Sequence, residues 1–315
     1  MINKQKYKDF CKLENDLPIF SQHWWLDAVC GKDNWDVVII EKGGQIWATM
    51  PYYTTRKMML KMVFMPKITQ FMGPYIKYPK GQKYERKLSY EKEIMTELID
   101  KLPKVDFFYQ DFSPSIQNWL PFFWNGFKQT TRYTYSIEDT SDIDNIFSDF
   151  KSNIKTDIKK AKKIVNIDTS LGIENFYNIN KMTFDRQNMD IPYSLDFLRN
   201  FDKKCKENNA SKIYFAIDKE NNIHSAIYVV WDKQTMYYLL SGGNPQFRNS
   251  GATSLLLFEA IQDASKMGLS FDFEGSMIEP IEKVFRAFGG KLTPYYQVTK
   301  AKNRFIHSLF CITKG

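Results

Sequence analysis

The sequence has 315 residues and a mass of 37.2 kDa, which is about two domains at roughly 150 residues per domain. Hydrophobic residues make up 43% and charged residues 25% of the chain, an ordinary globular composition that excludes wholesale disorder. The 44 Lys and Arg outnumber the 36 Asp and Glu, so the net charge is +8 and the pI is near 9.0. This mild basic excess suits an anionic ligand such as a phosphate, a nucleotide or RNA, and it equally suits simple solvation.

The cysteines and histidines are scattered along the chain. Cys11, Cys30, Cys205 and Cys311 include no C-x-x-C pair, which predicts free buried thiols instead of disulfides. The three histidines lack metal-ligand spacing, so we expect no metal site. The polar N-terminal segment lacks the apolar core of a signal peptide, and no stretch approaches about 18 consecutive apolar residues. These features predict a cytoplasmic protein without stable membrane insertion, and they do not specify its oligomeric state.

The N-terminal half is predicted to begin with a β-hairpin, in which strands at 36–41 and 45–53 flank Gly43-Gly44. Periodicity then predicts a helix, a strand, a second helix and a second strand, at 88–102, 105–112, 114–124 and 127–137.

Between the two halves, residues 150–163 have the pattern of a basic amphipathic helix. Ile154, Ile158 and Ala161 fall on one side, and six lysines occupy the others. Two interpretations stay open, a solvated helix face and a surface that contacts RNA or other phosphates.

The C-terminal half is predicted to repeat this order. A hairpin at 212–218 and 222–231 precedes a strand at 236–240, and then come a helix at 252–267 that ends at Gly268, a strand at 269–273, a helix at 278–288 and a strand at 292–299. The repetition predicts two copies of one α/β unit, with a boundary near 139–144. The alternative is that alternating helices and strands resemble each other by chance. We predict domains at 1–140 and 141–315 and an α/β fold with mixed sheets.

The segment after residue 240 is the strongest candidate for a binding site. A strand ends there, and a helix begins at about 251–253. Unpaired N–H groups and the positive end of the helix dipole favour an anion at such a position. Gly251 would let a phosphate approach the backbone, and Arg248 would add a charged donor. The spacing fits neither a Walker loop nor the dinucleotide fingerprint, and Gly242-Gly243 could also be a simple turn.

This position also suits acyl transfer, because open α/β sheets bind ligands at the C-terminal ends of their strands. Backbone N–H groups around 237–241 could polarise a carbonyl and stabilise an oxyanion. Asp272 and Glu274, at the next strand end, are candidate general bases towards an amine. Of two neighbouring tyrosines, we expect one to face the core and the other, Tyr238, to face the cleft as a donor or acid. The alternative for Asp272 is that it caps a turn or pairs with a lysine.

Several segments, in order, resemble FemABX-like proteins, which are built from two GCN-five-related N-acetyltransferase (GNAT) domains. The similar segments of the second half are Tyr238–Gly243, Leu255–Ile261, Phe271–Gly275 and Val284–Gly290. The basic helix at 153–163 and the opening Ser21-Gln22-His23-Trp24-Trp25 are also similar to segments of this family. Glu274 departs from the family pattern, which has glycine there, and Arg286 replaces a lysine.

The resemblance implies two tandem GNAT-like domains, each with a mixed central sheet flanked by helices, and a BioF-type acetyltransferase domain in the second half. It implies transfer of an acyl or aminoacyl group to an amine. Residues 248–253 are similar to the loop that holds the pyrophosphate of acyl-CoA, although Thr253 replaces a smaller residue. The residues predicted to bind the donor are Ser241, Gly242, Arg248, Gly251, Ala252 and Thr253; those predicted to be catalytic are Asp272, Glu274 and Tyr238.

Three functions follow from these features. The leading hypothesis is an N-acyltransferase that uses acyl-CoA and a small-molecule or peptide amine, without a metal. The second is aminoacyl-tRNA-dependent transfer to a cell-wall peptidoglycan precursor, in which Lys159, Lys160, Lys162 and Lys163 would contact phosphates. The third is a non-catalytic relative that binds a ligand. The first half has no equivalent phosphate loop, and we expect it to help hold the acceptor.

Overall fold

The structure is a computed structural model that describes residues 2–57 and 59–311. Its contacts divide the chain into two compact units. The first comprises Met1–Arg132 and Pro294–Gly315, and the second comprises Tyr133–Thr293. This division differs from the predicted split at 140/141 mainly at the C-terminal end, because the residues from Pro294 onward pack with the first unit. As a statement about domains, the split at 140/141 stays a prediction.

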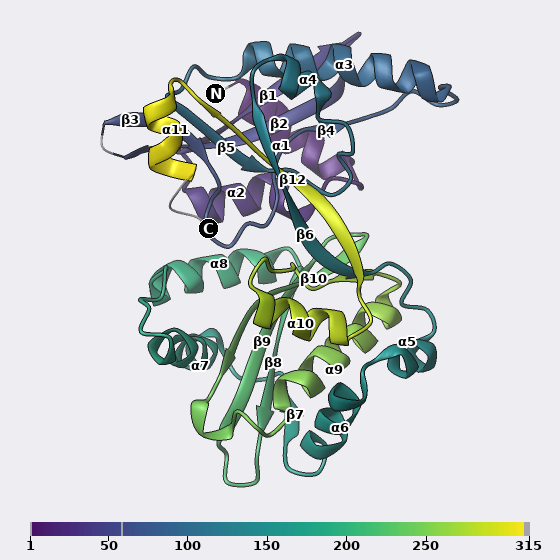
Figure 1. Cartoon of the computed structure of the whole chain (residues 1–315), viewed down its shortest axis with the longest axis vertical. Helices are drawn as coiled ribbons and strands as arrows, with labels where there is room; N and C mark the ends of the chain where they lie inside the picture. Colours follow the sequence, from purple (N-terminus) through teal and green to yellow (C-terminus); the bar gives the residue numbers. More distant parts are fainter. Residues whose placement is uncertain (1, 58, 312–315) are drawn as a thin grey trace. The chain divides into compact units, whose positions relative to one another are not determined.

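The first unit is a mixed sheet with helices around it (Figure 1). Its strands pair in the order β1 (Trp35–Lys42), β2 (Gln45–Lys57), β3 (Leu60–Phe64), β5 (Phe107–Asp111) and β12 (Lys291–Ala301), and β4 (Tyr75–Ile76) pairs with β2. Only the β3–β5 pair of this series is parallel. The helices are α1 (Ile2–Leu13), α2 (His23–Cys30), α3 (Tyr84–Lys101), α4 (Leu120–Trp124) and α11 (Arg304–Cys311), with a short 3-10 helix η1 (Ile19–Ser21).

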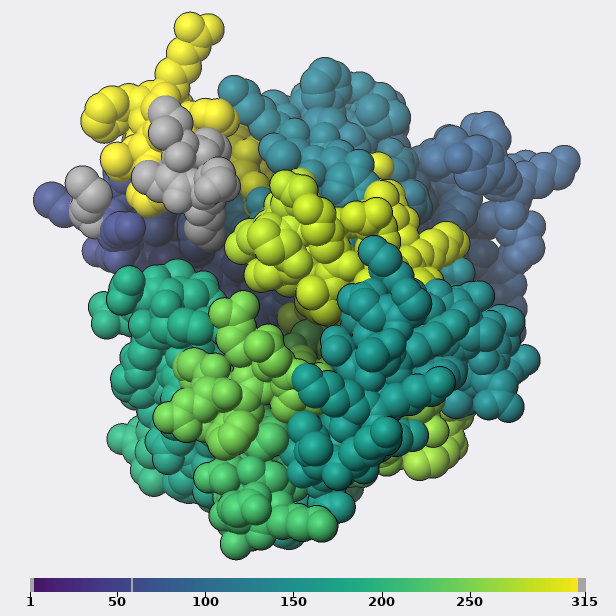
Figure 2. Space-filling view, turned by 60° about the horizontal axis from the view of Figure 1, so that its bottom comes forward, coloured from purple at the N-terminus to yellow at the C-terminus, as the bar shows by residue number. Residues whose placement is uncertain are grey.

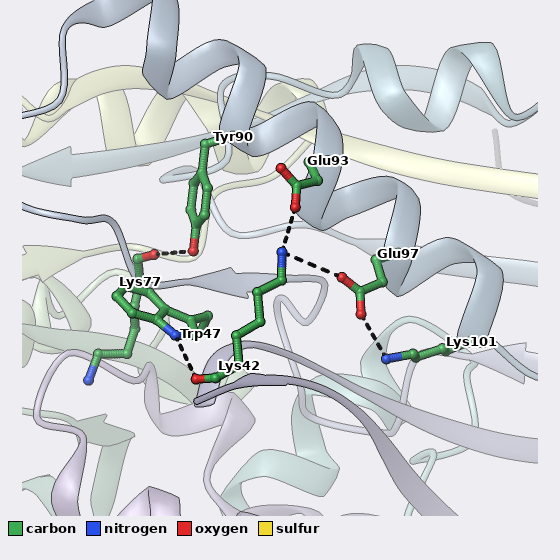
Figure 3. A network of polar contacts seen from close by, with 7 residues as sticks. All are labelled: Lys42, Trp47, Lys77, Tyr90, Glu93, Glu97 and Lys101. Carbon is green, nitrogen blue, oxygen red and sulfur yellow. Dashed lines mark hydrogen bonds and ion pairs between the residues drawn. The ribbon is translucent and has the colours of Figure 1, made fainter. Parts of the chain in front are cut away.

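Helix α3 packs against the β1–β2 hairpin through a buried apolar face and through ion pairs on one flank. Its buried face carries Ile94 and Leu98 into a core that also includes Val298 of β12. On one flank, Lys42 Nζ lies between the carboxylates of Glu93 and Glu97 (Figure 3). The predicted hairpin is confirmed, and β1 pairs with β2 in antiparallel register.

Helix α4 is shorter than the predicted helix at 114–124, because it begins only at Leu120. The preceding residues satisfy their backbone groups through side chains instead. Ser113 Oγ accepts the N–H of Ser115 at 3.3 Å, and Asn118 Oδ1 accepts the N–H of Leu120 at 3.2 Å. Such side-chain bonds compete with helix formation, so the helix starts next to Pro121, which needs no N–H acceptor there.

The second unit also has a mixed sheet. Its strands pair in the order β6 (Lys128–Ile137), β11 (Ser270–Asp272), β10 (Thr235–Gly243), β9 (Ile223–Trp231), β8 (Ser211–Ile217) and β7 (Asn166–Asp168), and only β10 and β11 are parallel. The helices are α5 (Ile143–Asp149), α6 (Ser152–Ala161), α7 (Ile173–Arg186), α8 (Leu195–Glu207), α9 (Ala252–Met267) and α10 (Glu279–Ala287), with a 3-10 helix η2 (Pro245–Phe247).

Helices cover both faces of this second sheet. Phe176 of α7 and Phe201 of α8 contact the ring of Tyr228 on β9. The neighbouring residues Ile227 and Val229 point into the opposite core, which contains side chains of α5, α6, α9 and α10, as the alternation of a strand requires. The predicted α/β fold class, mixed sheets flanked by helices, is thus confirmed.

The last strand of each predicted repeat pairs in the sheet of the other repeat. β6 ends the run α3-β5-α4-β6, but its residue Ile137 pairs with Phe271 of β11. β12 ends the run α9-β11-α10-β12, but its residue Gln297 pairs with Asp111 of β5. This exchange explains why the C-terminal residues belong to the first unit.

Cys11, Cys30 and Cys205 are buried free thiols, as predicted, whereas the Cys311 side chain lies outside the described part. Among the described residues, no group of three or more His, Cys, Asp or Glu could hold a metal ion. None of the described helices is both long enough and apolar enough to cross a lipid bilayer.

Candidate functional site

The parallel strands β10 and β11 form a fork in the second unit. They pair only from Thr235↔Ser270 to Tyr237↔Asp272. β10 then continues to Gly243 along β9, with a register shift between Tyr238 and Leu240. Beyond Tyr237, the edge of β10 that faces away from β9 is therefore no longer paired with β11. Helix α9 connects the two strands and begins at the open end of the fork.

A cavity of about 550 Å³ lies at this end of β10. It is lined by residues 241–244 and 247–254, and by Asp157, Lys160, Thr183, Arg186, His224 and Ser225. All six residues predicted to bind the donor line this one cavity. Helix α6 lies beside α9 (Figure 1) and contributes to the cavity wall. Its Lys160 Nζ donates to the Asn249 carbonyl at 2.6 Å. The predicted basic helix at 150–163 is confirmed as α6, with Ile154, Ile158 and Ala161 buried.

The first turn of α9 offers two backbone donors to the cavity. The N–H of Leu255 is bonded to the Gly251 carbonyl at 3.1 Å, and the N–H of Ala252 is bonded to Ser250 Oγ at 3.2 Å. The N–H groups of Thr253 and Ser254 have no acceptor among the described residues. Unpaired amides at a helix N-terminus favour an anion, so two of the three first-turn amides are available to a ligand.

The structure shows a packing reason for a glycine at position 251. Its φ is +79°, and an added Cβ would lie 2.3 Å from the Asp157 carbonyl oxygen of α6. Its missing side chain therefore makes room for α6, and the approach of a phosphate to this glycine stays a prediction. Gly242 is similar, since its Cβ would lie 2.4 Å from the Asn180 backbone nitrogen of α7. Both glycines allow helices to pack closely around the cavity.

Positive charge exceeds negative charge in the cavity wall. Arg186, Arg248 and Lys160 line it together with one carboxylate, Asp157. In the described part of the chain, neither Arg186 nor Arg248 has a carboxylate within ion-pair distance. Arginine without an internal partner can offer a full set of charged donors to a phosphate.

Helix α7 supplies side chains that the sequence analysis missed. Asn180 is 2% exposed, donates from Nδ2 to the Ser241 carbonyl at 2.6 Å and accepts from the Tyr193 hydroxyl at 2.8 Å. Thr183 Oγ1 accepts the Gly243 N–H at 3.0 Å. Asn180, Thr183 and Arg186 follow one another at three-residue spacing. Polar residues at this spacing lie on one side of a helix, and this pattern in the sequence could have indicated them as site residues.

The contacts of α7 also indicate which amide of β10 is free. The Ser241 carbonyl and the Gly243 N–H both point away from β9, towards α7. In an antiparallel strand, the N–H and carbonyl of one residue point to the same side, so the Ser241 N–H does so too. It has no acceptor among the described residues, so it is a β10 donor that the geometry leaves for a ligand carbonyl.

His224 was not among the predicted site residues either. Its ring stacks on Phe247 with centroids 4.0 Å apart and planes 3° apart, and its Nε2 lies 3.0 Å from Asp218 Oδ2. The stack packs η2, and with it the start of the loop that carries Arg248, against the β8–β9 hairpin.

Asp272 is in the last residue pair of the fork, opposite Tyr237, and Glu274 follows it after the end of β11; neither lines the cavity. Asp272 is 5% exposed, and its Oδ1 accepts from Thr134 Oγ1 at 2.5 Å and from the Glu274 N–H at 2.7 Å. It therefore caps the turn, which was the alternative to catalysis; its role as a base stays a prediction. Burial raises the pKa of Asp272 to about 6, because its effect exceeds that of the two hydrogen bonds, which lower the pKa.

Glu274 has a left-handed backbone, with φ +57°, and its Oε1 is buried without a partner in the described structure. Burial, and after it the charge of Asp272, raise the pKa of Glu274 well above its usual value. Burial therefore favours the protonated form of Glu274, whereas Asp272, with a pKa of about 6, is mostly ionised at neutral pH.

Tyr237 and Tyr238 differ in burial. Tyr237 is 6% exposed and donates to Asp232 at 3.2 Å. Tyr238 is half-buried, with its ring 6.0 Å from that of Phe285. Burial raises the pKa of Tyr238 to about 12, so it is a neutral phenol at physiological pH. It does not line the cavity, although it lies on the same strand three residues before Ser241.

Comparison with protein families assigns this part of the chain. Residues 148–277 match the family described as acetyltransferase (GNAT) domain. This part of the second unit is thus similar to GNAT-type acetyltransferase domains. The match includes α6, the fork, the cavity and both carboxylates. No protein among the curated sequences matches the chain.

Solved structures show the same fold over nearly the whole chain. FemX has a TM-score of 0.69 at 12% identity, over 98% of each chain. The C-terminal domain of a putative lysylphosphatidylglycerol synthetase from Agrobacterium fabrum has a TM-score of 0.56 at 11% identity, over 99% of this chain and 94% of that one. L-PGS from Bacillus licheniformis has a TM-score of 0.56 at 9% identity, over 98% and 94%.

The GNAT match confirms the predicted resemblance to acetyltransferases of this type and the predicted class of enzyme, a transferase. It supports acyl transfer in general, and the solved structures show that the fold is shared with FemX and with the two synthetases.

Proposed function

We propose that this protein is an N-acyltransferase that moves an acyl group from acyl-CoA to an amine. The observation that supports this best is the cavity at the start of α9. There, two unpaired amides, of Thr253 and Ser254, meet two arginines that have no carboxylate partner in the described chain. This donor set suits the diphosphate of coenzyme A, and the cavity lies within the GNAT match.

Ser241, Asp272 and Tyr238 have defined tasks under this proposal. The Ser241 N–H holds the carbonyl oxygen of the acyl group and stabilises the oxyanion that forms when the amine attacks the carbonyl carbon. Asp272, mostly ionised at neutral pH, accepts the proton that the amine loses. Tyr238, a phenol at this pH, supplies the proton that the departing thiolate takes up. Glu274, whose pKa is raised well above its usual value by burial and then by the charge of Asp272, has no step of its own in this transfer.

Replacing Arg248 tests the donor assignment. Arg248 is exposed and has no ion-pair partner among the described residues, so Arg248→Ala leaves the fold unchanged. We expect coenzyme A affinity, measured by calorimetry, to fall about tenfold or more, because hydrogen bonds to charged groups contribute roughly 1.5–3 kcal/mol. Substitution of Gly251 would be less informative, since any side chain there displaces α6.

Arg304→Ala is the matched control, because Arg304 is an exposed arginine of α11 in the first unit. It should leave coenzyme A affinity unchanged. If Arg248→Ala binds coenzyme A as tightly as the wild type does, the phosphate assignment is wrong.

Aminoacyl-tRNA is the second candidate donor, favoured by the likeness to FemX over 98% of each chain. The exposed Lys159, Lys162 and Lys163 of the α6 region provide cations for such a partner. Under this alternative, tRNA affinity decreases steeply between 50 and 200 mM salt, because each neutralised phosphate releases counterions. The acyl-CoA proposal requires no such binding.

A further inference from the structure

The first unit exposes an apolar surface that its fold does not use. We call it the α3–α4 patch: Tyr84 and Leu88 of α3, and Leu120, Phe123 and Trp124 of α4, which are 76%, 36%, 48%, 55% and 56% exposed. The blue atoms of α3 and the blue-green atoms of the segment with α4 lie next to each other at the surface of the first unit in Figure 2. By contrast, Phe122 of α4 is fully buried and holds the helix on the core.

Two observations join these residues into one surface. Lys92 Nζ of α3 lies 5.3 Å above the centre of the Trp124 ring, which brings this side of α3 to α4. Tyr84 and Leu88 precede Lys92 at four-residue spacing, so they lie on the same side of the helix. The patch therefore runs from the first turn of α3 to the end of α4.

Three lysines near the patch have no carboxylate within ion-pair distance in the described part of the chain: Lys92, Lys128 and Lys300. Lys92 contacts the Trp124 ring, and Lys128 begins β6, four residues after Trp124. Lys300 Nζ lies 4.8 Å above the Phe127 ring and donates to the Asn125 carbonyl at 2.8 Å, directly after α4.

The acidic residues of α3 are mostly engaged elsewhere. Glu93 and Glu97 are bound by Lys42 on the flank that faces the β1–β2 hairpin (Figure 3). Glu91 is buried and accepts from the Tyr78 hydroxyl and from Asn118 Nδ2. Glu85, in the first turn, accepts from the Ser89 hydroxyl, and Asp100, eight residues after Lys92, lies on the same side of α3 at the end of the helix. The surface around Trp124 therefore combines aromatic rings with uncompensated lysines.

We propose that the α3–α4 patch docks this protein on an anionic lipid bilayer. Tryptophan and phenylalanine favour the boundary between headgroups and acyl chains, and lysines beside them are attracted to anionic lipids. A protein partner would need matching carboxylates, whereas an anionic bilayer presents the negative charge of its lipid phosphates as a continuous surface. The patch is in the first unit and the acyl-transfer cavity is in the second, so this inference does not rest on the proposed function.

Vesicle sedimentation of the full-length protein tests the proposal. We expect binding to phosphatidylcholine vesicles that contain phosphatidylglycerol and none to phosphatidylcholine alone. The variant Phe123→Ser/Trp124→Ser should lower the partition coefficient at least tenfold. Lys92→Gln and Lys128→Gln should each lower it about fivefold, the change that corresponds to about 1 kcal/mol per lysine near an anionic surface.

Met267→Ser is the matched control, because Met267 is a 46% exposed apolar residue of the second unit; it should bind as the wild type does. The proposal is overturned if the wild type ignores anionic vesicles, or if the Phe123/Trp124 variant still binds them. It is also overturned if light scattering shows a dimer that this variant dissociates, because the patch would then be covered by a second copy.

Discussion

At the scale of single residues, Asp272 combines a structural and a proposed chemical role. Its Oδ1 accepts both the Thr134 hydroxyl and the Glu274 N–H, so it fixes the turn at the end of β11. The same burial that makes these bonds useful also raises the pKa of the carboxyl group to about 6. A general base is most effective when its pKa lies near the working pH, so the turn-capping residue is also the better placed of the two carboxylates for proton transfer.

The raised pKa of Asp272 makes the free energy of unfolding depend on pH. The folded state holds this proton more tightly than the unfolded chain, whose pKa is near 3.8, so the stabilisation is complete below about pH 4 and is lost as the pH rises through 6. Between these limits the wild type should lose up to about 3 kcal/mol that Asp272→Asn does not lose. Urea unfolding at several pH values measures the difference, and parallel curves for the two proteins would show that the carboxyl group is not perturbed.

Local pattern was sufficient to predict which residues come together at the end of β10, whereas their roles stay predictions. All six predicted donor-binding residues line one cavity, because a strand end and a helix start are local features. Asn180 and Thr183 were missed because their partners, Ser241 and Gly243, are about 60 residues away along the chain. The purpose of Gly251 was also hidden, since only the fold brings Asp157 of α6 against it.

At the scale of elements, α9 was predicted with the bounds it has, 252–267, because a glycine with positive φ flanks each end. Gly251 has φ +79° and Gly268 has φ +68°. The two positions differ in surroundings: a Cβ at Gly251 would lie 2.3 Å from the Asp157 carbonyl oxygen, whereas a Cβ at Gly268 would meet nothing within 4 Å. A side chain at Gly268 would therefore cause backbone strain alone, whereas one at Gly251 would cause strain and a steric clash with α6.

Alanine substitutions at these two glycines should differ in their cost. Gly268→Ala should lower the free energy of unfolding by about 1 kcal/mol, which is the strain of a left-handed backbone alone. Gly251→Ala should lower it by at least about 2 kcal/mol more, because α6 must also move away from the start of α9. Urea titrations provide the comparison, and equal losses for the two variants would mean that α6 does not pack on Gly251.

Helices α7 and α8 were absent from the predicted elements, although they cover one face of the second sheet. Their buried stripes contain polar residues, which weaken the periodic signal. Asp202 of α8 is 4% exposed and accepts from the Tyr228 hydroxyl at 2.9 Å and from Lys206 at 2.8 Å. In the sequence alone, an aspartate at this position indicates an exposed site, because its partner on β9 is distant along the chain.

At the scale of the whole molecule, the sequence correctly predicted the repeated order of elements but not the exchange of the last strands. β6 and β12 each follow a short helix and a glycine turn, and nothing local distinguishes the sheet that each one joins. Residue Val298 of β12 lies fully buried in the core of the first unit, with Phe108 and Leu98. The stability of the N-terminal sheet therefore depends on residues near the C-terminus.

This dependence gives opposite expectations for two core substitutions in the C-terminal half. Val298→Ala should accelerate amide exchange in β5 and α3 of the first unit, whereas Leu256→Ala, also fully buried, should accelerate it in α9 and β9 of the second. A core truncation that costs on the order of 2 kcal/mol makes exchange about thirtyfold faster in the unit it destabilises. Hydrogen–deuterium exchange with mass spectrometry resolves the two patterns. If Val298→Ala instead loosens the same segments as Leu256→Ala, the chain behaves as domains 1–140 and 141–315, and the strand exchange does not divide its stability.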